Sequence, residues 1–264
     1  MFADRVAVVT GASSGIGAAI ATDLAGRGAR IVAVARRADR LAEVVETCRA
    51  SSPDSIAHPA DVSSQAACDE VIATTEDRFG RVDILVNNAG ISIHKNAART
   101  SVEEIERLMA VNFFAPVYLS MAALPGMLER RDGSIVNVTS VAGYVPNPGE
   151  SAYGASKAAL SRWSHGLAVD LDGTGVHVGV VSPGPIDTEI WSLDEEQSYT
   201  GKLYPPQVVA EAVAKMIERR VTHLTAPRRY GAVGALYPLV GRPMRWGIRR
   251  YEARAQRRST PHDD

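Results

Sequence analysis

The sequence has very little cysteine: only Cys48 and Cys68 occur among its 264 residues. The two form no CxxC pair and have no cluster of histidines beside them, which argues against a disulfide framework and against a zinc site. No metal-ligand spacing relates the remaining histidines considered for such a site, which are His58, His165, His177, His223 and His262. We therefore expect inert packing thiols, a reducing compartment and no bound metal.

An excess of charge of one sign is also missing. Lysine and arginine number 29 against 30 aspartates and glutamates, so the formal net charge is -1 and the overall electrostatics do not favour a nucleic-acid partner. No run approaches the roughly eighteen apolar residues of a membrane-spanning helix. The N-terminal MFADRVAVVTGASSG has no basic region followed by an apolar stretch and a cleavage site. These absences favour a cytoplasmic protein.

The C-terminal segment 228–264 is the one strongly basic region of the sequence. It contains nine arginines and three acidic residues, Glu252, Asp263 and Asp264, with apolar side chains interspersed. We interpret this tail as packing against the core or another subunit. Peripheral contact with an anionic membrane surface and a cover over the substrate are the alternatives.

Short β-branched runs alternate with longer segments of helical period. Strands are predicted at 5–10, 30–35, 55–60, 82–87, 134–140, 176–182 and 222–227. Helices are predicted between them at 15–27, 38–50, 63–79, 101–130, 152–172 and 206–220. The strands are rich in valine and isoleucine, as is typical of strands buried on both faces. The pattern predicts an α/β fold with a single doubly wound domain of about seven parallel strands and helices on both faces.

No repeat or low-complexity linker divides the chain before residue 227, so we assign 1–227 to one domain and 228–264 to the tail. The stretch 183–206 interrupts the alternation with PGPID, a mixed acidic and aromatic section, and YPP. Because long loops in compact domains often cover a site, we predict a substrate loop over 183–206. Its apolar side chains favour a substrate with hydrophobic bulk; they are Trp191, Leu193, Tyr199 and Leu203.

Gly11, Gly15 and Gly17 lie where the first predicted strand passes into the first predicted helix, in VVTGASSGIGAAIA. Missing side chains let backbone N–H groups approach a pyrophosphate, and a helix N-terminus adds free N–H groups and a positive dipole end. The spacing differs from the common GxGxxG fingerprint. We interpret the turn as a binding site for the phosphates of a dinucleotide.

Tyr153 and Lys157 are four residues apart in SAYGASKAAL, within a predicted helix, and therefore share one helix face. A cation beside a phenol lowers the tyrosine pKa by roughly 1 to 3 units. A shift of about three units from the ordinary value near 10 would leave Tyr153 about half ionised at neutral pH. The spacing permits this contact but does not require it.

Several motifs together resemble those of a known family. They are TGxxxGIG at Thr10–Gly17, ADV at 60–62, NNAG at 87–90, Asn112 in MAVNFFAP, Ser140 in NVTSVAG, the YxxxK pair and SPGPIDT at 182–188. In this order and at these separations they resemble the classical short-chain dehydrogenase/reductase family over about residues 5–227. The resemblance implies a Rossmann-like fold and an oxidoreductase that forms a homodimer or homotetramer.

The resemblance assigns the catalytic set to Asn112, Ser140, Tyr153 and Lys157, and the chemistry to hydride transfer between a nicotinamide and a secondary alcohol or carbonyl. Tyr153 is then the general acid or base, Ser140 stabilises charge on the substrate oxygen, and Lys157 supports tyrosinate and the ribose. Asn112 is expected to hold a helix bend and a water that links Lys157 to solvent. The expected cofactor-binding residues are Gly11, Ser13, Ser14, Gly15, Ile16, Gly17, Arg36, Arg37, Asp61, Val62, Asn88, Ala89, Gly90, Tyr153, Lys157, Pro183, Gly184, Ile186 and Thr188.

Arg36 occupies the position at which the resemblance places an aspartate in NAD-selective relatives, and Arg37 follows it. A carboxylate there would accept hydrogen bonds from a ribose 2′-hydroxyl, whereas a guanidinium binds a 2′-phosphate. Ser13 and Ser14 depart from the arginine or lysine that some NADP-preferring relatives carry in the glycine turn. We predict NADP(H) as the cofactor, with NAD(H) as the alternative.

Two other functions stay open at this point. One is a cofactor-sensing or scaffolding protein that keeps the fold without chemistry, which the intact catalytic set disfavours. The other is a nucleotide-sugar epimerase, because related enzymes also use YxxxK; the short C-terminal region and the TGxxxGIG form disfavour it. His94, which follows NNAGIS, is expected to face solvent, with a contact to the substrate as the alternative.

Overall fold

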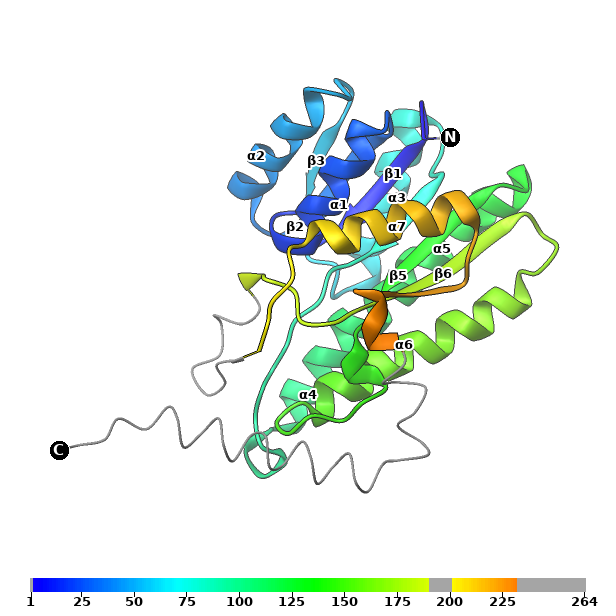
Figure 1. Cartoon of the computed structure of the whole chain (residues 1–264). Helices are drawn as coiled ribbons and strands as arrows, with labels where there is room; N and C mark the ends of the chain where they lie inside the picture. The colour runs from blue at the N-terminus through cyan, green and yellow to red at the C-terminus, as the bar shows by residue number, and fades with distance from the viewer. Residues whose placement is uncertain (1, 190–200, 232–264) are drawn as a thin grey trace.

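The fold is built on one parallel β-sheet, as the alternation of strands and helices predicts (Figure 1). It is seen in a computed structural model that describes residues 2–189 and 201–231. Seven strands lie in the order β3-β2-β1-β4-β5-β6-β7, and every neighbouring pair is parallel. They are β1 Val6–Thr10, β2 Arg30–Ala35, β3 Ile56–Pro59, β4 Ile84–Asn87, β5 Gly133–Val138, β6 Val176–Pro183 and β7 His223–Ala226. Each predicted strand is confirmed, with ends that differ by at most two residues.

Helices cover both faces of this sheet. The longer ones are α1 Gly15–Gly26, α2 Ala38–Arg49, α3 Gln65–Phe79, α4 Val102–Met109, α5 Ala115–Arg130, α6 Ser151–Asp170 and α7 Gln207–Arg219. Short turns are η1 Ala97–Arg99, η2 Ala110–Phe114, η3 Val141–Gly143 and η5 Arg228–Tyr230. α1, α2 and α7 pack on one face, and α3, α5 and α6 pack on the other (Figure 1). The predicted doubly wound, Rossmann-like fold is therefore confirmed.

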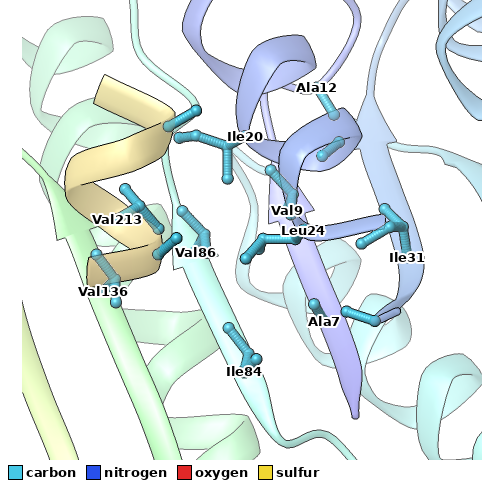
Figure 2. Close-up of a cluster of buried hydrophobic side chains, with 14 of the residues drawn as sticks. Ala7, Val9, Ala12, Ile20, Leu24, Ile31, Ile84, Val86, Val136 and Val213 are labelled. Atoms are coloured by element: carbon cyan, nitrogen blue, oxygen red, sulfur yellow. The ribbon is translucent and has the colours of Figure 1, made fainter. Parts of the chain in front are cut away.

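The strands divide their side chains between two hydrophobic cores. In β1, Ala7 and Val9 belong to the core under α1 and α7, whereas Val6 and Val8 belong to the core under α3 and α5. Figure 2 shows the first core, where side chains of α1 and α7 meet those of the central strands. Successive side chains of a strand point to opposite faces. Because both faces are buried, the strand appears in the sequence as an unbroken apolar run.

The predicted helix 101–130 contains a π-helical turn that its periodicity did not reveal. A capping box of Ser101 and Glu104 starts α4, the π-helical η2 follows, and α5 continues to Arg130. By length and composition alone, the segment Val102–Arg130 could cross a membrane. Leu119 and Met127 of α5 fill the second core, so part of the apolar character of the segment serves packing inside the protein.

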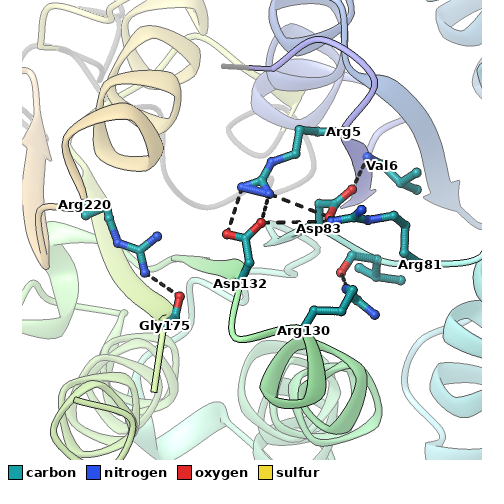
Figure 3. A network of polar contacts seen from close by, with 9 residues as sticks. Arg5, Val6, Arg81, Asp83, Arg130, Asp132, Gly175 and Arg220 are labelled. Carbon is teal, nitrogen blue, oxygen red and sulfur yellow. Dashed lines mark hydrogen bonds and ion pairs between the residues drawn. The ribbon is translucent and has the colours of Figure 1, made fainter. Parts of the chain in front are cut away.

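A polar network joins the amino ends of three strands (Figure 3). Asp83, just before β4, is buried, and its Oδ2 accepts the N–H of Val6 at 2.9 Å. Arg81 donates to Asp83 at 2.6 Å, and Arg5 binds Asp132, which precedes β5. A buried carboxylate needs such partners, because an unpaired one is costly. The network holds β1, β4 and β5 together at this edge and leaves the opposite, carboxyl edge to the loops that carry the site.

Some sequence predictions concern residues outside the described ranges. The tail beyond residue 231 and the apolar Trp191, Leu193 and Tyr199 of the substrate loop lie there, so these remain predictions, as does the domain boundary at 227. In the described part of that loop, Ile186 pairs with Tyr204 in a parallel bridge. The two ends of the predicted substrate loop are therefore held side by side.

Candidate active site

The predicted site residues gather at the carboxyl edge of the sheet. The chain passes from β1 to β2 and β3 on one side and then returns to β4 on the other side of β1. In doubly wound sheets, ligands bind in the crevice at such a change of direction. The loops after β1 and β4 flank this crevice, and the loops after β5 and β6 lie next along the same edge.

The turn after β1 has a conformation that suits glycine alone. Gly11 and Gly15 have φ angles of 66° and 54°. A Cβ on Gly17 would lie 2.2 Å from the carbonyl oxygen of Gly11 and 2.6 Å from Nδ2 of Asn88. Ser14, the N-cap of α1, makes no side-chain bond to the first N–H groups of that helix. The turn presents backbone donors at a helix N-terminus and therefore fits the pyrophosphate of a dinucleotide.

The loop after β4 is joined to this turn. Oγ1 of Thr10 accepts the N–H groups of Asn88 and Ala89, each at 3.0 Å. The side-chain amide of Asn88 donates to the carbonyl of Thr10 at 2.9 Å, and Ile16 anchors the start of α1 on the first core. The Asn88–Gly90 segment and the glycine turn are thereby held as one unit.

Ser140, Tyr153 and Lys157 come together where β5 faces α6. Ser140 follows β5, and its Oγ accepts the N–H of Ala142 at 3.1 Å. Its hydroxyl lies near enough to the phenol of Tyr153 to lower the pKa of that group. Lys157 lies one turn further along α6, is buried, and donates to the carbonyl of Val138 at 3.2 Å. The helix spacing that the sequence predicted thus carries both side chains to the carboxyl end of β5.

Asn112 lies in the π-helical turn and connects the loop after β4 to α6. Its Oδ1 accepts the N–H of Ile91 at 2.9 Å, and its Nδ2 donates to the carbonyl of Ile91 at 2.9 Å and to Oγ of Ser156 at 3.0 Å. A Cβ on Gly90 would lie 3.2 Å from Nζ of Lys157 and 3.3 Å from Oδ1 of Asn112. Asn112 and Lys157 therefore border the same glycine.

The lowered pKa that the spacing of Tyr153 and Lys157 permits is not found in this structure. Burial raises the pKa of Tyr153 to about 12; the bond with Ser140 lowers it, and the charge of Glu150 raises it. Burial also lowers the pKa of Lys157 to about 8. Nζ of Lys157 lies 6.0 Å from the centre of the Tyr153 ring, and its hydrogen bond goes to Val138. The phenol is protonated at neutral pH, the form that donates a proton to a carbonyl oxygen.

His94 is buried, so the expectation that it faces solvent is wrong. Its Nε2 lies 3.1 Å from Oε1 of Glu150 and 3.2 Å from Oγ of Ser92, and its ring centre lies 6.3 Å from that of Tyr153. The other carboxylate oxygen of Glu150 accepts from Nδ2 of Asn147 at 2.7 Å. Sequence reasoning missed Glu150, whose only signal is its place three residues before Tyr153. The contact between His94 and Glu150 therefore places a buried carboxylate near the phenol of Tyr153.

At the end of β2, the side chain that reaches the glycine turn is Arg37 rather than Arg36. The guanidinium of Arg37 donates to Oγ of Ser14 at 2.7 Å and to Oγ of Ser13 at 3.2 Å. The two serines add no positive charge of their own to the turn. They instead help to position the guanidinium of Arg37 beside it.

Asp61 and Val62 follow β3, further from the crevice. Oδ1 of Asp61 accepts the N–H of Ser63 at 3.0 Å, and this bond is the main reason why the pKa of Asp61 is lowered, with the positive charge of Arg36 as a smaller cause. Val62 is buried in the second core. The positive charge of Arg36 thus acts on the carboxylate that follows β3.

The loop after β6 passes over the glycine turn. Pro183 ends β6, and the N–H of Gly184 donates to the last residue of β7 at 2.9 Å. Ile186 is buried in the first core. A Cβ on Gly15 would lie only 3.0 Å from Cγ2 of Thr188. The residues predicted to bind the nicotinamide end therefore lie on the same edge as the turn predicted to bind the pyrophosphate.

Comparison with known proteins decides the family. The family model of short chain dehydrogenases matches residues 5–198. The chain belongs to the short-chain dehydrogenase/reductase family. An uncharacterized oxidoreductase of Staphylococcus saprophyticus is 37% identical over 211 residues, which cover 80% of this chain and 90% of that protein. The protein is therefore an oxidoreductase, as the motifs predicted.

Solved structures of short-chain dehydrogenases share the fold. One from Burkholderia phymatum, in complex with NAD, has a TM-score of 0.83 and 27% identity and covers 90% of this chain and 94% of its own. An alcohol dehydrogenase from the archaeon Thermococcus sibiricus, complexed with 5-hydroxy-NADP, has a TM-score of 0.76 and 28% identity and covers 84% and 95%. Both of these structures therefore hold a nicotinamide dinucleotide. The one in the second structure carries a 2′-phosphate, and the one in the first does not.

Proposed function

We propose that this short-chain dehydrogenase/reductase transfers a hydride between NADP(H) and a secondary alcohol or carbonyl compound with hydrophobic bulk, with Tyr153 as the general acid or base. The observation that carries the proposal is the meeting of Ser140, Tyr153 and the buried Lys157 at the carboxyl end of β5, where Nζ of Lys157 lies 6.0 Å from the centre of the Tyr153 ring. This group lies on the sheet edge where the glycine turn fits a dinucleotide.

When bound, the nicotinamide supplies or accepts the hydride. In the reductive direction, protonated Tyr153 donates its phenolic proton to the carbonyl oxygen, and Ser140 hydrogen-bonds the same oxygen as negative charge develops on it. Because the pKa of Lys157 is about 8, its ammonium is mostly charged at neutral pH. That charge stabilises the tyrosinate left behind, and the same group orients the ribose.

The proposed cofactor residues divide by position along the sheet edge. The glycine turn and Asn88–Gly90 would hold the pyrophosphate and the adjoining ribose, and Asp61 and Val62 would border the adenine. Pro183, Gly184, Ile186 and Thr188 would hold the nicotinamide end. Asn112 joins the loop after β4 to α6 through its bonds to Ile91 and Ser156.

A test of the reaction class is the consumption of NADPH with a panel of ketones, aldehydes, sterols and acyl-chain carbonyls, and NADP reduction with secondary alcohols. We expect turnover with at least one class. Absence of turnover in every class, from protein that binds NADPH, would instead support the cofactor-sensing alternative. Turnover of a nucleotide sugar without net cofactor consumption would support the epimerase.

The cofactor preference is expected to depend on Arg37. The wild-type protein should bind NADPH at least about tenfold more tightly than NADH, because a guanidinium forms paired, charge-assisted bonds with a phosphate. Arg37→Gln should lose most of this preference. Arg78→Gln is the matched control, since Arg78 is exposed on α3. Equal affinities of the wild type for the two cofactors in a fluorescence titration would refute the preference.

We also propose that the protein assembles through one face of its long helical segment. Phe114, Met121 and Leu128 are exposed large hydrophobic side chains, 43%, 53% and 37% accessible. They are spaced by seven residues and so form one stripe on η2 and α5. An exposed apolar stripe of this kind marks an interaction surface. A second copy of the chain is its proposed occupant.

Charge placed in this stripe should dissociate the assembly. Phe114→Glu combined with Met121→Glu is expected to lower the mass measured by light scattering to that of one chain, because charges in an apolar interface lose their hydration. Ala42→Glu combined with Thr47→Glu adds the same two charges to exposed positions of α2 and should leave the mass unchanged. A wild-type protein that is already monomeric would contradict the proposal.

A further inference from the structure

A carboxylate from the loop after β6 lies between two arginines of α2. Oε2 of Glu189 accepts from Nη1 of Arg37 at 2.9 Å, and Oε1 accepts from Nη1 of Arg40. Arg37 also holds the hydroxyl groups of Ser13 and Ser14 in the glycine turn. Three segments far apart in the sequence therefore meet around one negative group.

The chemistry of this cluster is that of an anion site. The arginine fork binds carboxylates and phosphates in the same manner, through paired charge-assisted hydrogen bonds. The side chains of Arg37, Arg40 and Glu189 are 43%, 49% and 42% exposed, so a ligand in solution can reach them. The hydrogen bond from Arg37, and then that from Arg40, lowers the pKa of Glu189, which keeps the carboxylate charged at neutral pH.

We propose that Glu189 is an internal competitor of the cofactor's 2′-phosphate for Arg37 and Arg40, and that Arg40 takes part in binding this phosphate. The inference rests on the proposed function in assuming a nicotinamide dinucleotide in the crevice. It adds two residues that the sequence motifs did not indicate, because Arg40 lies beyond the two arginines after β2 and Glu189 is 152 residues from Arg37.

The competition has a direction that follows from charge. A cofactor without the 2′-phosphate leaves the Glu189 pairs in place, so Glu189 does not oppose its binding. A phosphate must take the guanidinium groups from the carboxylate, or bind beside it against like-charge repulsion. Glu189 therefore lowers the affinity for the phosphorylated cofactor selectively, and the protein is less selective for NADP(H) than its arginines alone would make it.

The test compares four ligands on the full chain: NADPH, NADH, 2′,5′-ADP and 5′-AMP, titrated by fluorescence or calorimetry. Glu189→Gln keeps the shape and removes the charge. It should tighten NADPH and 2′,5′-ADP by about three- to tenfold, since two half-exposed ion pairs are lost. NADH and 5′-AMP should stay within about twofold. Arg40→Gln should weaken the two phosphorylated ligands and spare the other two.

Matched controls separate this effect from a general change of charge. Glu46→Gln removes the same charge from an exposed position on α2, where the carboxylate pairs with Arg49, and Arg78→Gln removes a guanidinium from an exposed position on α3. Neither should discriminate between ligands with and without the phosphate. Equal tightening of all four ligands by Glu189→Gln, or no tightening of any, would overturn the inference.

The outcomes also separate this inference from the proposed cofactor preference. If the wild type binds NADPH and NADH equally, the preference fails, yet a preference created by Glu189→Gln would support the competition. If the wild type prefers NADPH and Glu189→Gln changes nothing, the preference stands and the competition is wrong. Circular dichroism melts of the variants, all at exposed or half-buried positions, check that each is folded.

Discussion

Replacement of Tyr153 by phenylalanine is expected to lower turnover by a factor of about 10² to 10⁴, the usual contribution of a positioned general acid or base. The affinity for the cofactor should change by only a few-fold. Phenylalanine keeps the ring beside His94 and removes only the hydroxyl, whose pKa Ser140 lowers. Steady-state kinetics on a substrate found in the panel, with a separate cofactor titration, measure the two quantities.

Tyr118→Phe is the matched control for this substitution. Tyr118 lies on α5, where its ring stacks on that of Phe114 at 6.0 Å, away from the proposed catalytic set. Loss of its hydroxyl should leave turnover within about twofold, as is usual for surface changes. Undiminished turnover in Tyr153→Phe would remove Tyr153 from the mechanism.

Replacement of Lys157 by methionine is expected to abolish most activity and, at neutral pH, to stabilise the fold. Burial lowers the pKa of Lys157 from 10.5 to about 8, and this difference corresponds to about 3 kcal/mol of unfavourable interaction with the charged form. Loss of the hydrogen bond to Val138 offsets about 1 kcal/mol. The net gain in the free energy of unfolding at pH 7 is therefore about 2 kcal/mol.

The pH dependence of this gain has a definite sign. Below pH 8 the lysine is charged in both states, and the folded protein bears the full cost of burying the charge. Between pH 8 and 10.5 the unfolded chain binds more protons than the folded one, so wild-type stability rises with pH relative to the methionine variant. Urea unfolding at pH 7 and at pH 10 should show the gap between the two proteins shrinking.

Lys215→Met controls for the change of residue type, because Lys215 lies on α7, is partly exposed, and is distant from the proposed catalytic set. It should give no comparable gain at pH 7. A gap between Lys157→Met and wild type that stays constant from pH 7 to pH 10 would show that the buried ammonium is not its cause. Lys157→Met is thus expected to gain stability and to lose activity. Such an opposition is common where an active site needs a buried charge.

The secondary structure and the place of the site could be predicted because they depend on local pattern. Strands buried on both faces are apolar throughout, and a crossover helix must lie between parallel neighbours. Residues that follow such strands meet at one edge, whatever the loops between them contain. The glycine turn, Ser140 and the Tyr153–Lys157 pair could therefore be assigned to one site from the sequence alone.

Other features depend on contacts between residues distant in the sequence. The choice between Arg36 and Arg37 follows from which way each side chain leaves the end of β2, and only Arg37 meets Ser13 and Ser14. The burial of His94 follows from its bond to Glu150, which lies 56 residues later. No local period or motif encodes either contact.

By itself, then, the sequence determined the sheet, its layers and the family, because apolar periodicity and motif order are properties of the chain. Only the tertiary structure decided the ionisation of Tyr153 and Lys157 and the partner of Arg37 and Arg40. A pKa depends on how completely the surrounding elements exclude water from a group. The position of Glu189 between two arginines depends on how the loop after β6 packs over α1 and α2.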